Sequence, residues 1–451
     1  GHHRDLHSFP TRRSSDLFLT PNSQFLFCQK QGQEKIDSLL KELPKAKEDT
    51  NKVNLLYALS FEYNSINPDK GLEYASKCLA LAEELNYKIG IASAFNRYGD
   101  NYLVKSQYQM SIDYHFKSMK ICEEIGYKFG VATGFRNLGI VYDYQSNYPK
   151  ALEYYFNALK INEEIGDKGG IASNLTDIGS LYSIQSDYPK ALEYYFKAIK
   201  IFNEIGYKSG IAENLGNIGN IYLYQSDYPK ALEYYFKALK INEELGYKGG
   251  ISRNIGNIGV VYKNLSNYPK ALEYYFTALK ICEELGNKKG ISVNLCNIGA
   301  LYFQLSQDTN FAKINERNEF VGLTKEINLW NGIKYSEHAA EIAHEIEDLD
   351  LLKEVYKNLS DGYSQLGDYK NAYEYNEKSW KLKDSIFSFE NQKKLKELET
   401  TRDLEKRDAE IKIYKANDKF QKSVIIGTGG IILIVIFFLY LVWRQRRKSE
   451  K

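Results

Sequence analysis

The sequence has few of the residue patterns that build enzyme active sites or metal centres. Its five cysteines are odd in number and scattered between positions 28 and 296, so they form neither a disulfide framework nor a Cys-x-x-Cys metal site. His338 and His344 lack the i, i+4 spacing of a helical metal pair. The sequence contains no phosphate loop, Gly-x-Ser-x-Gly or Cys/His motif. It therefore predicts a non-catalytic chain that uses no cofactor.

No charge of one sign dominates the sequence. Its 60 Lys and Arg residues nearly balance its 58 Asp and Glu residues, which gives a net charge of +2. This balance excludes a strongly basic protein that binds nucleic acid, and it excludes an acidic solvating tail. Proline and tryptophan are rare, with 8 and 3 copies, whereas tyrosine occurs 38 times. Such heavy use of one aromatic residue indicates a motif that is copied many times.

A period of 40 residues fills the middle of the chain. The segment YPKALEYYF occurs four times without change, at 148–156, 188–196, 228–236 and 268–276. Glycines recur at the same step, at positions 90, 130, 170, 210, 250 and 290. A repeat of this length is typical of solenoids, propellers and other arrays.

The periodicity within one repeat predicts two helices and two short turns. Pro229 suits the first turn of a helix, Asp227 can cap that helix, and Gly246 can end it. A preceding helix is expected over residues 211–224. One helix pair cannot bury its own apolar face, but a stack of pairs buries a continuous core. The helical spacing of apolar residues appears at Leu232, Tyr235, Ala238, Leu239 and Leu245.

The small and aromatic residues of each unit resemble the tetratricopeptide repeat. In the unit from 210 to 249 these residues are Gly219, Tyr222, Tyr228, Ala231, Tyr235 and Ala238. The unit is longer than the usual repeat, Leu215 stands where that family has a tryptophan, and no proline closes it. It therefore resembles the 40-residue variety. The resemblance implies an all-α solenoid of helical hairpins that binds a protein or a peptide.

We expect eight such repeats over residues 50–388, with an insertion near 306–328. Ile333 and Tyr335 match Leu152 and Tyr154 of an earlier repeat, and this register places the restart of the second helix near Gly332. The segment 18–49 is expected to hold the remnant of a signal sequence and an entry helix from Glu34 to Leu43. Residues 1–17 resemble a translated sequencing adapter, so we interpret them as a non-native leader that replaces the natural N-terminus.

The C-terminal part predicts a stalk, a membrane span and a basic tail. Residues 389–422 are highly charged and should form a helical stalk that can pair as a coiled coil, giving a homodimer through stalk and span. Residues 423–443 are uncharged over 21 positions, enough for one transmembrane helix. The positive-inside rule places tail 444–451 in the cytoplasm and the repeats outside the inner membrane. The flanking residues are Trp443, Arg444, Arg446, Arg447 and Lys448.

A row of polar residues two places before the repeat glycine is the candidate binding site. In the family that the repeats resemble, this position lies on the inner helix, where an amide side chain can bond an extended peptide backbone. The alternative is that each side chain bonds a neighbouring helix. The row, called the polar ladder below, consists of Asn137, Asp177, Asn217, Asn257, Asn297 and Asn358, and Arg97 holds the position in the second repeat.

Two classes of function agree with these patterns. The first is a membrane-anchored, non-catalytic scaffold or receptor that binds a peptide or protein in the groove of the solenoid. The second is a truncated bacterial sensor, because the order of repeats, stalk and span resembles sensors in which a histidine kinase, nucleotide cyclase or DNA-binding domain follows the span. A third interpretation, a tail-anchored adaptor with its repeats in the cytoplasm, is disfavoured by the basic tail. Nucleic acid is not an expected partner.

Overall fold

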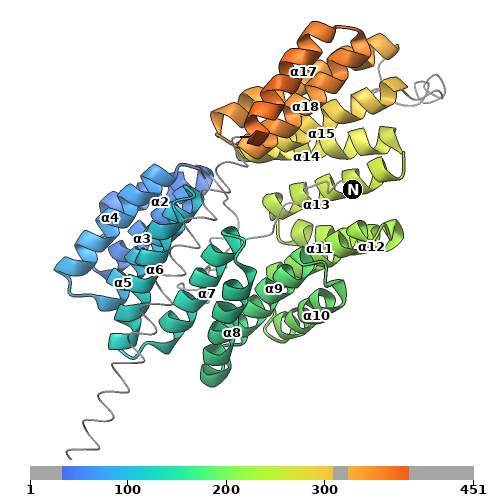
Figure 1. Ribbon diagram of the computed structural model, residues 1–451. Helices are drawn as coiled ribbons and strands as arrows, with labels where there is room; N and C mark the ends of the chain where they lie inside the picture. The colour runs from blue at the N-terminus through green and yellow to red at the C-terminus, as the bar shows by residue number, and fades with distance from the viewer. Residues whose placement is uncertain (1–32, 65, 308–323, 385–451) are drawn as a thin grey trace, which may run out of the picture. The chain divides into compact units, whose positions relative to one another are not determined.

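The computed structural model describes residues 33–64, 66–307 and 324–384. Within these ranges every regular element is a helix, which confirms the expected all-α fold (Figure 1). The chain divides into two units, 1–379 and 380–451, and all contacts discussed below lie within the first. The elements are α2 (Gln33–Glu42), η1 (Leu43–Lys45), α3 (Thr50–Asn64), α4 (Pro68–Glu84), α5 (Lys88–Val104), α6 (Tyr108–Glu124), α7 (Lys128–Tyr144), α8 (Tyr148–Ile165), α9 (Lys168–Ile184), α10 (Tyr188–Glu204), α11 (Lys208–Tyr224), α12 (Tyr228–Glu244), α13 (Lys248–Asn264), α14 (Tyr268–Leu285), α15 (Lys288–Gln307), α17 (Lys325–Glu345) and α18 (Leu349–Leu366).

From α3 onward, consecutive helices pack in pairs as hairpins (Figure 1). The pairs are α3–α4, α5–α6, α7–α8, α9–α10, α11–α12, α13–α14 and α15–α17, and α18 precedes a further helical stretch at 369–384. The first helices of these hairpins also contact one another across repeats, in the pairs α3–α5, α5–α7, α7–α9, α9–α11, α11–α13 and α15–α18. We call these eight helices, α3, α5, α7, α9, α11, α13, α15 and α18, the first-helix layer.

Local sequence explains why each second helix begins where it does. The side chain of Asp227 accepts a hydrogen bond from the backbone N–H of Lys230 at 3.2 Å, and Pro229 occupies the first turn. This bond satisfies one of the backbone donors that a helix start leaves without a partner. Asn147, Asp187 and Asn267 cap their helices in the same way. The identical YPKALEYYF segments therefore start identical helices.

In the regular hairpins from α5 to α14, both kinds of turn contain a residue with positive φ. After the second helix this residue is a glycine, such as Gly246 with φ +63°. After the first helix it is a serine, at positions 106, 146, 186, 226 and 266, with φ between 56° and 63°. The left-handed region favours glycine because a Cβ crowds the backbone there. The serine turns are therefore held by the packing on either side of them.

Glycine in the first helix makes room for tyrosine in the second. A Cβ at Gly219 would lie 2.6 Å from the Tyr235 ring, and a Cβ at Gly179 would lie 2.9 Å from the Tyr195 ring. Tyr235 is fully buried as a result. A second pair of tyrosines stacks beside it, with ring centroids 5.4 Å apart for Tyr222 and Tyr234. These contacts fix how closely the two helices of a hairpin approach.

The register of the seventh hairpin agrees with the match of Tyr335 to Tyr154. Tyr302 stacks on Tyr335 with ring centroids 5.7 Å apart, as Tyr142 stacks on Tyr154 at 5.2 Å. Lys288 forms an ion pair with Glu345, as Lys128 does with Glu164. The interruption of the repeat therefore leaves the pairing of the hairpin unchanged.

The two flanking helices extend into the expected bounds of the insertion, near 306–328. Helix α15 continues to Gln307, because Leu305 is fully buried and its last turn packs on the final repeat. Helix α17 begins at Lys325 and not near Gly332, because Asn328 and Leu329 are buried in its first turns. Residues 308–323, between the two helices, lie outside the described part of the chain.

Several expectations concern residues that the structure does not describe. They are the leader at 1–17, the signal remnant at the start of 18–49, the stalk at 389–422, the span at 423–443 and the tail at 444–451. The entry segment does contain helix α2, from Gln33 to Glu42. Among the described residues, no helix is both long enough and apolar enough to cross a membrane.

Candidate functional site

The polar ladder lies entirely in the first-helix layer. Its six residues stand on α7, α9, α11, α13, α15 and α18, so the repeat brings them to equivalent places on successive helices. Their exposure is low: Asn137 and Asn257 are 3% exposed and Asn217 is 5% exposed. Asp177, Asn297 and Asn358 are partly exposed. The centre of the ladder therefore presents little surface to a ligand.

Three ladder residues bond a neighbouring helix of the same layer. Asn257 on α13 donates from Nδ2 to Oδ1 of Asn220 on α11 at 3.2 Å. Asp177 on α9 accepts from Nε of Arg136 on α7 at 2.6 Å. On α18, Asn358 donates from Nδ2 to the Cys296 sulfur on α15 at 3.3 Å.

These bonds link consecutive repeats, which is the alternative that the sequence left open for the ladder. Asn220 also accepts a hydrogen bond from the hydroxyl of Tyr235 at 2.7 Å, so the second helix of that hairpin joins the link. The structure therefore gives these ladder positions an architectural role. The exposed residues beside them on the first helices remain available for binding.

Arg97, which holds the ladder position in the second repeat, belongs to a buried ionic cluster that the sequence analysis did not identify. Arg97 is 1% exposed, and its guanidinium lies 2.6 Å from the carboxylate of Asp100. The same guanidinium lies 4.5 Å from the ring centre of Tyr57 on α3, a cation–π contact. The signal in the sequence is the replacement of a repeated Asn by Arg97, which marks where the regular repeats meet the degenerate first unit.

His115 on α6 is fully buried next to this cluster. Its Nδ1 lies 3.2 Å from Oδ1 of Asn96, and its Nε2 lies 3.7 Å from Oδ1 of Asp100. Burial lowers the pKa of His115 to about 4, although the Asp100 carboxylate acts in the opposite direction. The imidazole is therefore neutral at neutral pH, and it acts as a packed polar side chain of the core.

The titratable groups of the described residues bear on two kinds of chemical site, a metal centre and a reactive thiol. No group of three or more His, Cys, Asp or Glu side chains within these ranges could hold a metal ion. Burial raises the pKa of the Cys78 and Cys296 thiols to about 12, so both remain protonated at neutral pH. A protonated, buried thiol is a poor nucleophile.

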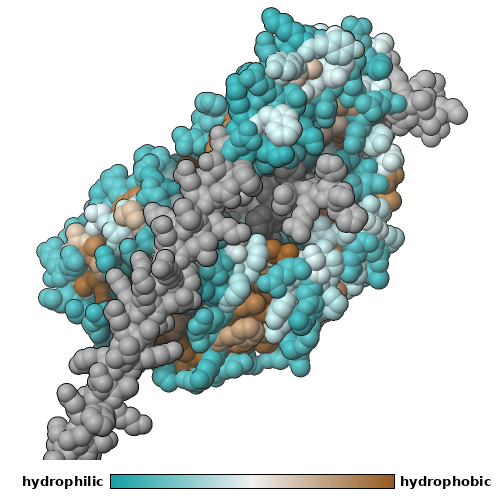
Figure 2. Space-filling view, in the orientation of Figure 1, coloured by the Kyte–Doolittle hydropathy of each residue, from teal (hydrophilic) through white to brown (hydrophobic). Residues whose placement is uncertain are grey.

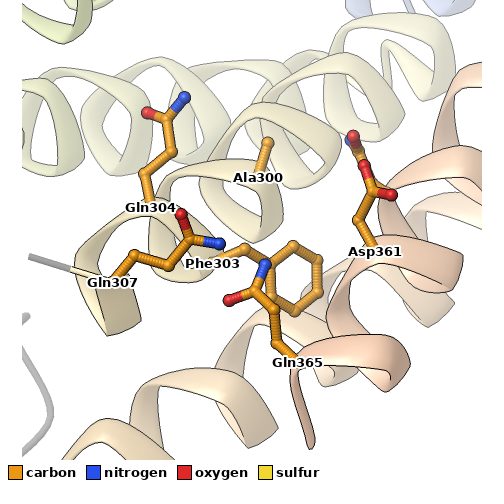
Figure 3. Close-up of a pocket in the computed structure, with 7 residues that line it drawn as sticks. Ala300, Phe303, Gln304, Gln307, Asp361 and Gln365 are labelled. Carbon is orange, nitrogen blue, oxygen red and sulfur yellow. The ribbon is translucent and has the colours of Figure 1, made fainter.

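A small pocket opens where α15 meets α18 (Figure 3). Its volume is about 210 Å³. Helix α15 contributes Ala300, Phe303, Gln304 and Gln307, and α18 contributes Asn358, Asp361 and Gln365. Sequence reasoning named Asn358 but missed the others, because the pocket joins residues on two helices that the insertion and α17 separate in the sequence.

The side chains of this pocket converge around one aromatic ring. Figure 3 shows the amides of Gln307 and Gln365 reaching toward each other in front of Phe303, with Asp361 on the α18 side. Gln365 is oriented by Ser306, whose hydroxyl donates to Oε1 of Gln365 at 2.9 Å. Burial raises the pKa of the Asp361 carboxyl, although Lys357 acts in the opposite direction. We call this site the Asp361 pocket.

Apolar side chains are exposed at regular steps elsewhere on the surface. Figure 2 shows a mostly hydrophilic face with scattered hydrophobic patches. On the second helices, Phe156, Phe196 and Phe236 are 40%, 45% and 41% exposed. The ring of Phe196 also packs edge-on against the Tyr234 ring of the next repeat, with ring centroids 6.5 Å apart. Part of this surface therefore serves the stacking of repeats.

Comparison with known proteins identifies the repeats. The tetratricopeptide repeat model matches residues 90–164 and 170–244. None of the curated proteins matches this sequence.

Solved structures show the same fold at low sequence identity. The apo form of the quorum sensor NprR from B. thuringiensis is 15% identical, with a TM-score of 0.50, over 77% of this chain and 97% of that one. The Rap conjugation gene regulator of plasmid pLS20, in complex with the Phr* peptide, is 13% identical, with a TM-score of 0.51, over 79% and 90%. A signal transduction ATPase with a tetratricopeptide repeat sensor, PH0952 from Pyrococcus horikoshii, is 18% identical, with a TM-score of 0.52, over 80% and 54%.

Proposed function

We propose that this chain, whose residues 90–164 and 170–244 match the tetratricopeptide repeat model, is a non-catalytic scaffold that binds a peptide or a protein segment along its first-helix layer. The observation that carries the proposal is the Asp361 pocket, where amide side chains from two first helices converge. Amides offer both a donor and an acceptor, which suits the backbone of an extended chain. One of the similar structures is described as a complex with the Phr* peptide, which supports the same class of ligand.

The surface that we assign to binding consists of the partly exposed residues beside the ladder. Arg253 on α13 lies one turn before Asn257 and is partly exposed, and Glu213 holds the same place on α11. These charges vary between repeats, whereas the ladder residues that join helices are nearly constant. Variation on a constant framework is the pattern that lets one solenoid recognise one ligand.

A display selection tests the proposal directly. The full 451-residue chain, purified in a mild detergent, would be used to select from a library of random twelve-residue peptides, and the affinities of selected peptides would be measured by fluorescence anisotropy. Arg253→Glu should weaken a selected peptide about threefold or more, because it reverses a charge on the binding layer. The matched control is Lys240→Glu on α12, an exposed residue of the second-helix layer. Failure to select any peptide, or equal effects of the two variants, would contradict the proposal.

We also propose that residues 423–443 anchor the scaffold in the inner membrane, with the repeats outside and the tail inside. The support is the uncharged run of 21 residues followed by Arg444, Arg446, Arg447 and Lys448. Cysteines introduced one at a time within 391–418 should react with a membrane-impermeant maleimide added to intact spheroplasts. Labelling only after the membrane is opened would reverse the proposed orientation.

A second candidate is the sensor part of a larger signalling protein. The similarity to PH0952, described as an ATPase with a tetratricopeptide repeat sensor, favours it, since this chain covers 54% of that protein. Reading the DNA that follows the Lys451 codon separates the two candidates. A stop codon favours the scaffold, and an open frame into a kinase, cyclase or DNA-binding domain favours the sensor.

A further inference from the structure

The described residues that line the Asp361 pocket include one carboxylate and four side-chain amides. The amide nitrogen of Asn358 is engaged with the Cys296 sulfur, so its Oδ1 is the end of the amide that faces away from that bond. Asp361 follows one turn later on α18, which places a carboxylate on the same face of that helix. No Lys or Arg is among the described residues that line the pocket. The site therefore favours a ligand group that donates hydrogen bonds and carries positive charge.

The size of the pocket and its aromatic wall narrow the ligand further. A volume of about 210 Å³ is below the roughly 300–1,000 Å³ of sites for whole small molecules, so one side chain or one chain end fits. The Phe303 ring forms one wall. Phe303 is 4% exposed, so it offers a small apolar surface against which the aliphatic stem of Lys or Arg can pack.

We propose that the Asp361 pocket binds a cationic group of the peptide, supplied by a Lys or Arg side chain or by a free amino terminus. This inference rests on the proposed function, because it assigns one part of the peptide to one place on the first-helix layer. The position of the Asp361 carboxylate supports it, since Asp361 is the one acidic side chain among the described residues that line the pocket. Lys357 also acts on this carboxylate but does not line the pocket.

The test uses peptides selected with the full chain, as above, and compares Asp361→Asn with the wild-type chain. Asp361→Asn keeps the shape of the side chain and removes its charge, and the residue is exposed at the rim, so the fold should persist. The affinity for a Lys- or Arg-containing peptide should fall about three- to tenfold, as expected for one partly exposed ion pair. The matched control is Asp350→Asn on the same helix, which changes an exposed carboxylate paired with Lys353 outside the pocket.

Changes in the peptide identify the source of the charge. If a side chain enters the pocket, Lys→Gln or Arg→Gln in the peptide should lower the affinity as much as Asp361→Asn does. The two changes together should lower the affinity little more than either one alone. If the amino terminus enters, acetylation of the peptide should show this behaviour instead. Asp361→Lys should reject both kinds of peptide and should shift a new selection toward acidic residues.

The outcomes separate this inference from the proposed function. If tight peptides are selected but Asp361→Asn does not change their affinity, the cation site is wrong and the peptide-binding scaffold still holds. The same conclusion follows if Asp350→Asn lowers the affinity as much as Asp361→Asn does. Failure to select any peptide would overturn both. Circular dichroism of each variant ensures that a loss of binding is not a loss of helix.

Discussion

Two glycine positions allow a sharp test of how the hairpins are packed. Gly219 and Gly256 both lie inside first helices, on α11 and α13. Helix propensity alone favours alanine over glycine by about 1 kcal/mol at either position. The structure predicts that alanine changes stability in opposite directions at the two positions. A Cβ at Gly219 would lie 2.6 Å from the buried Tyr235 ring, whereas the nearest atom to a Cβ at Gly256 is Oδ1 of Asn294, 3.7 Å away.

The expected magnitudes follow from these distances. Gly256→Ala should stabilise its repeat by about 0.5–1 kcal/mol, since the methyl group makes ordinary contacts and the helix gains propensity. Gly219→Ala should destabilise by about 1–3 kcal/mol, the usual cost of overpacking, because Tyr235 is fully buried and cannot move aside. Native-state hydrogen exchange of the amides in each hairpin is the suitable measurement, because repeat arrays open locally and not in one step.

A third variant isolates the cause. Tyr235→Leu removes the ring that the new methyl group would meet, so Gly219→Ala should cost less in that background than in the wild-type chain. If Gly219→Ala and Gly256→Ala shift local stability in the same direction, or if the cost of Gly219→Ala is unchanged by Tyr235→Leu, then close approach to tyrosine does not explain the repeated glycine.

Two further predictions concern the buried polar groups. His115 has a pKa of about 4 in the folded chain against an ordinary value of 6.5, so the unfolded chain binds a proton first as the pH falls. The free energy of unfolding should therefore drop by up to about 3 kcal/mol between about pH 6.5 and pH 4. Urea denaturation of His115→Gln should show a weaker dependence of this free energy on pH. Asn257→Ala removes the bond to Asn220, so it should lower stability by about 0.5–1.5 kcal/mol while the affinity for a selected peptide changes less than twofold. A large loss of affinity without a loss of stability would restore the ladder as a binding site.

The hairpins could be predicted from the sequence because each carries its own signals. Asp227 and Pro229 mark the start of a helix, and the glycine and tyrosine at a fixed separation pack against each other within one hairpin. The match of Tyr335 to Tyr154 also held, since the Tyr302–Tyr335 stack preserves the geometry of the regular repeats. These features depend on local spacing, which a repeated sequence displays many times.

The features that sequence could not show depend on contacts between repeats. Asn257 was placed correctly on its helix, but its burial is set by α11, which covers it from the neighbouring hairpin. The extra turn of α15 arises because the ring of Phe303 fills the space beside Gly332 and Gly362, which the insertion separates from it in sequence. The Asp361 pocket depends on the same approach of α15 to α18.

The sameness of successive hairpin interfaces has a consequence for the gene. Leu192 on α10 packs against a cluster that includes Ile218 of the next hairpin, and Leu232 on α12 packs against the equivalent cluster that includes Ile258. Loss of the 120 base pairs that encode residues 208–247 would join α10 directly to α13 and would recreate this packing against the cluster of Ile258. Unequal recombination between the four identical YPKALEYYF segments can therefore shorten or lengthen the array by whole hairpins. Each such event changes the length of the ligand that the layer can span, without requiring any new interface.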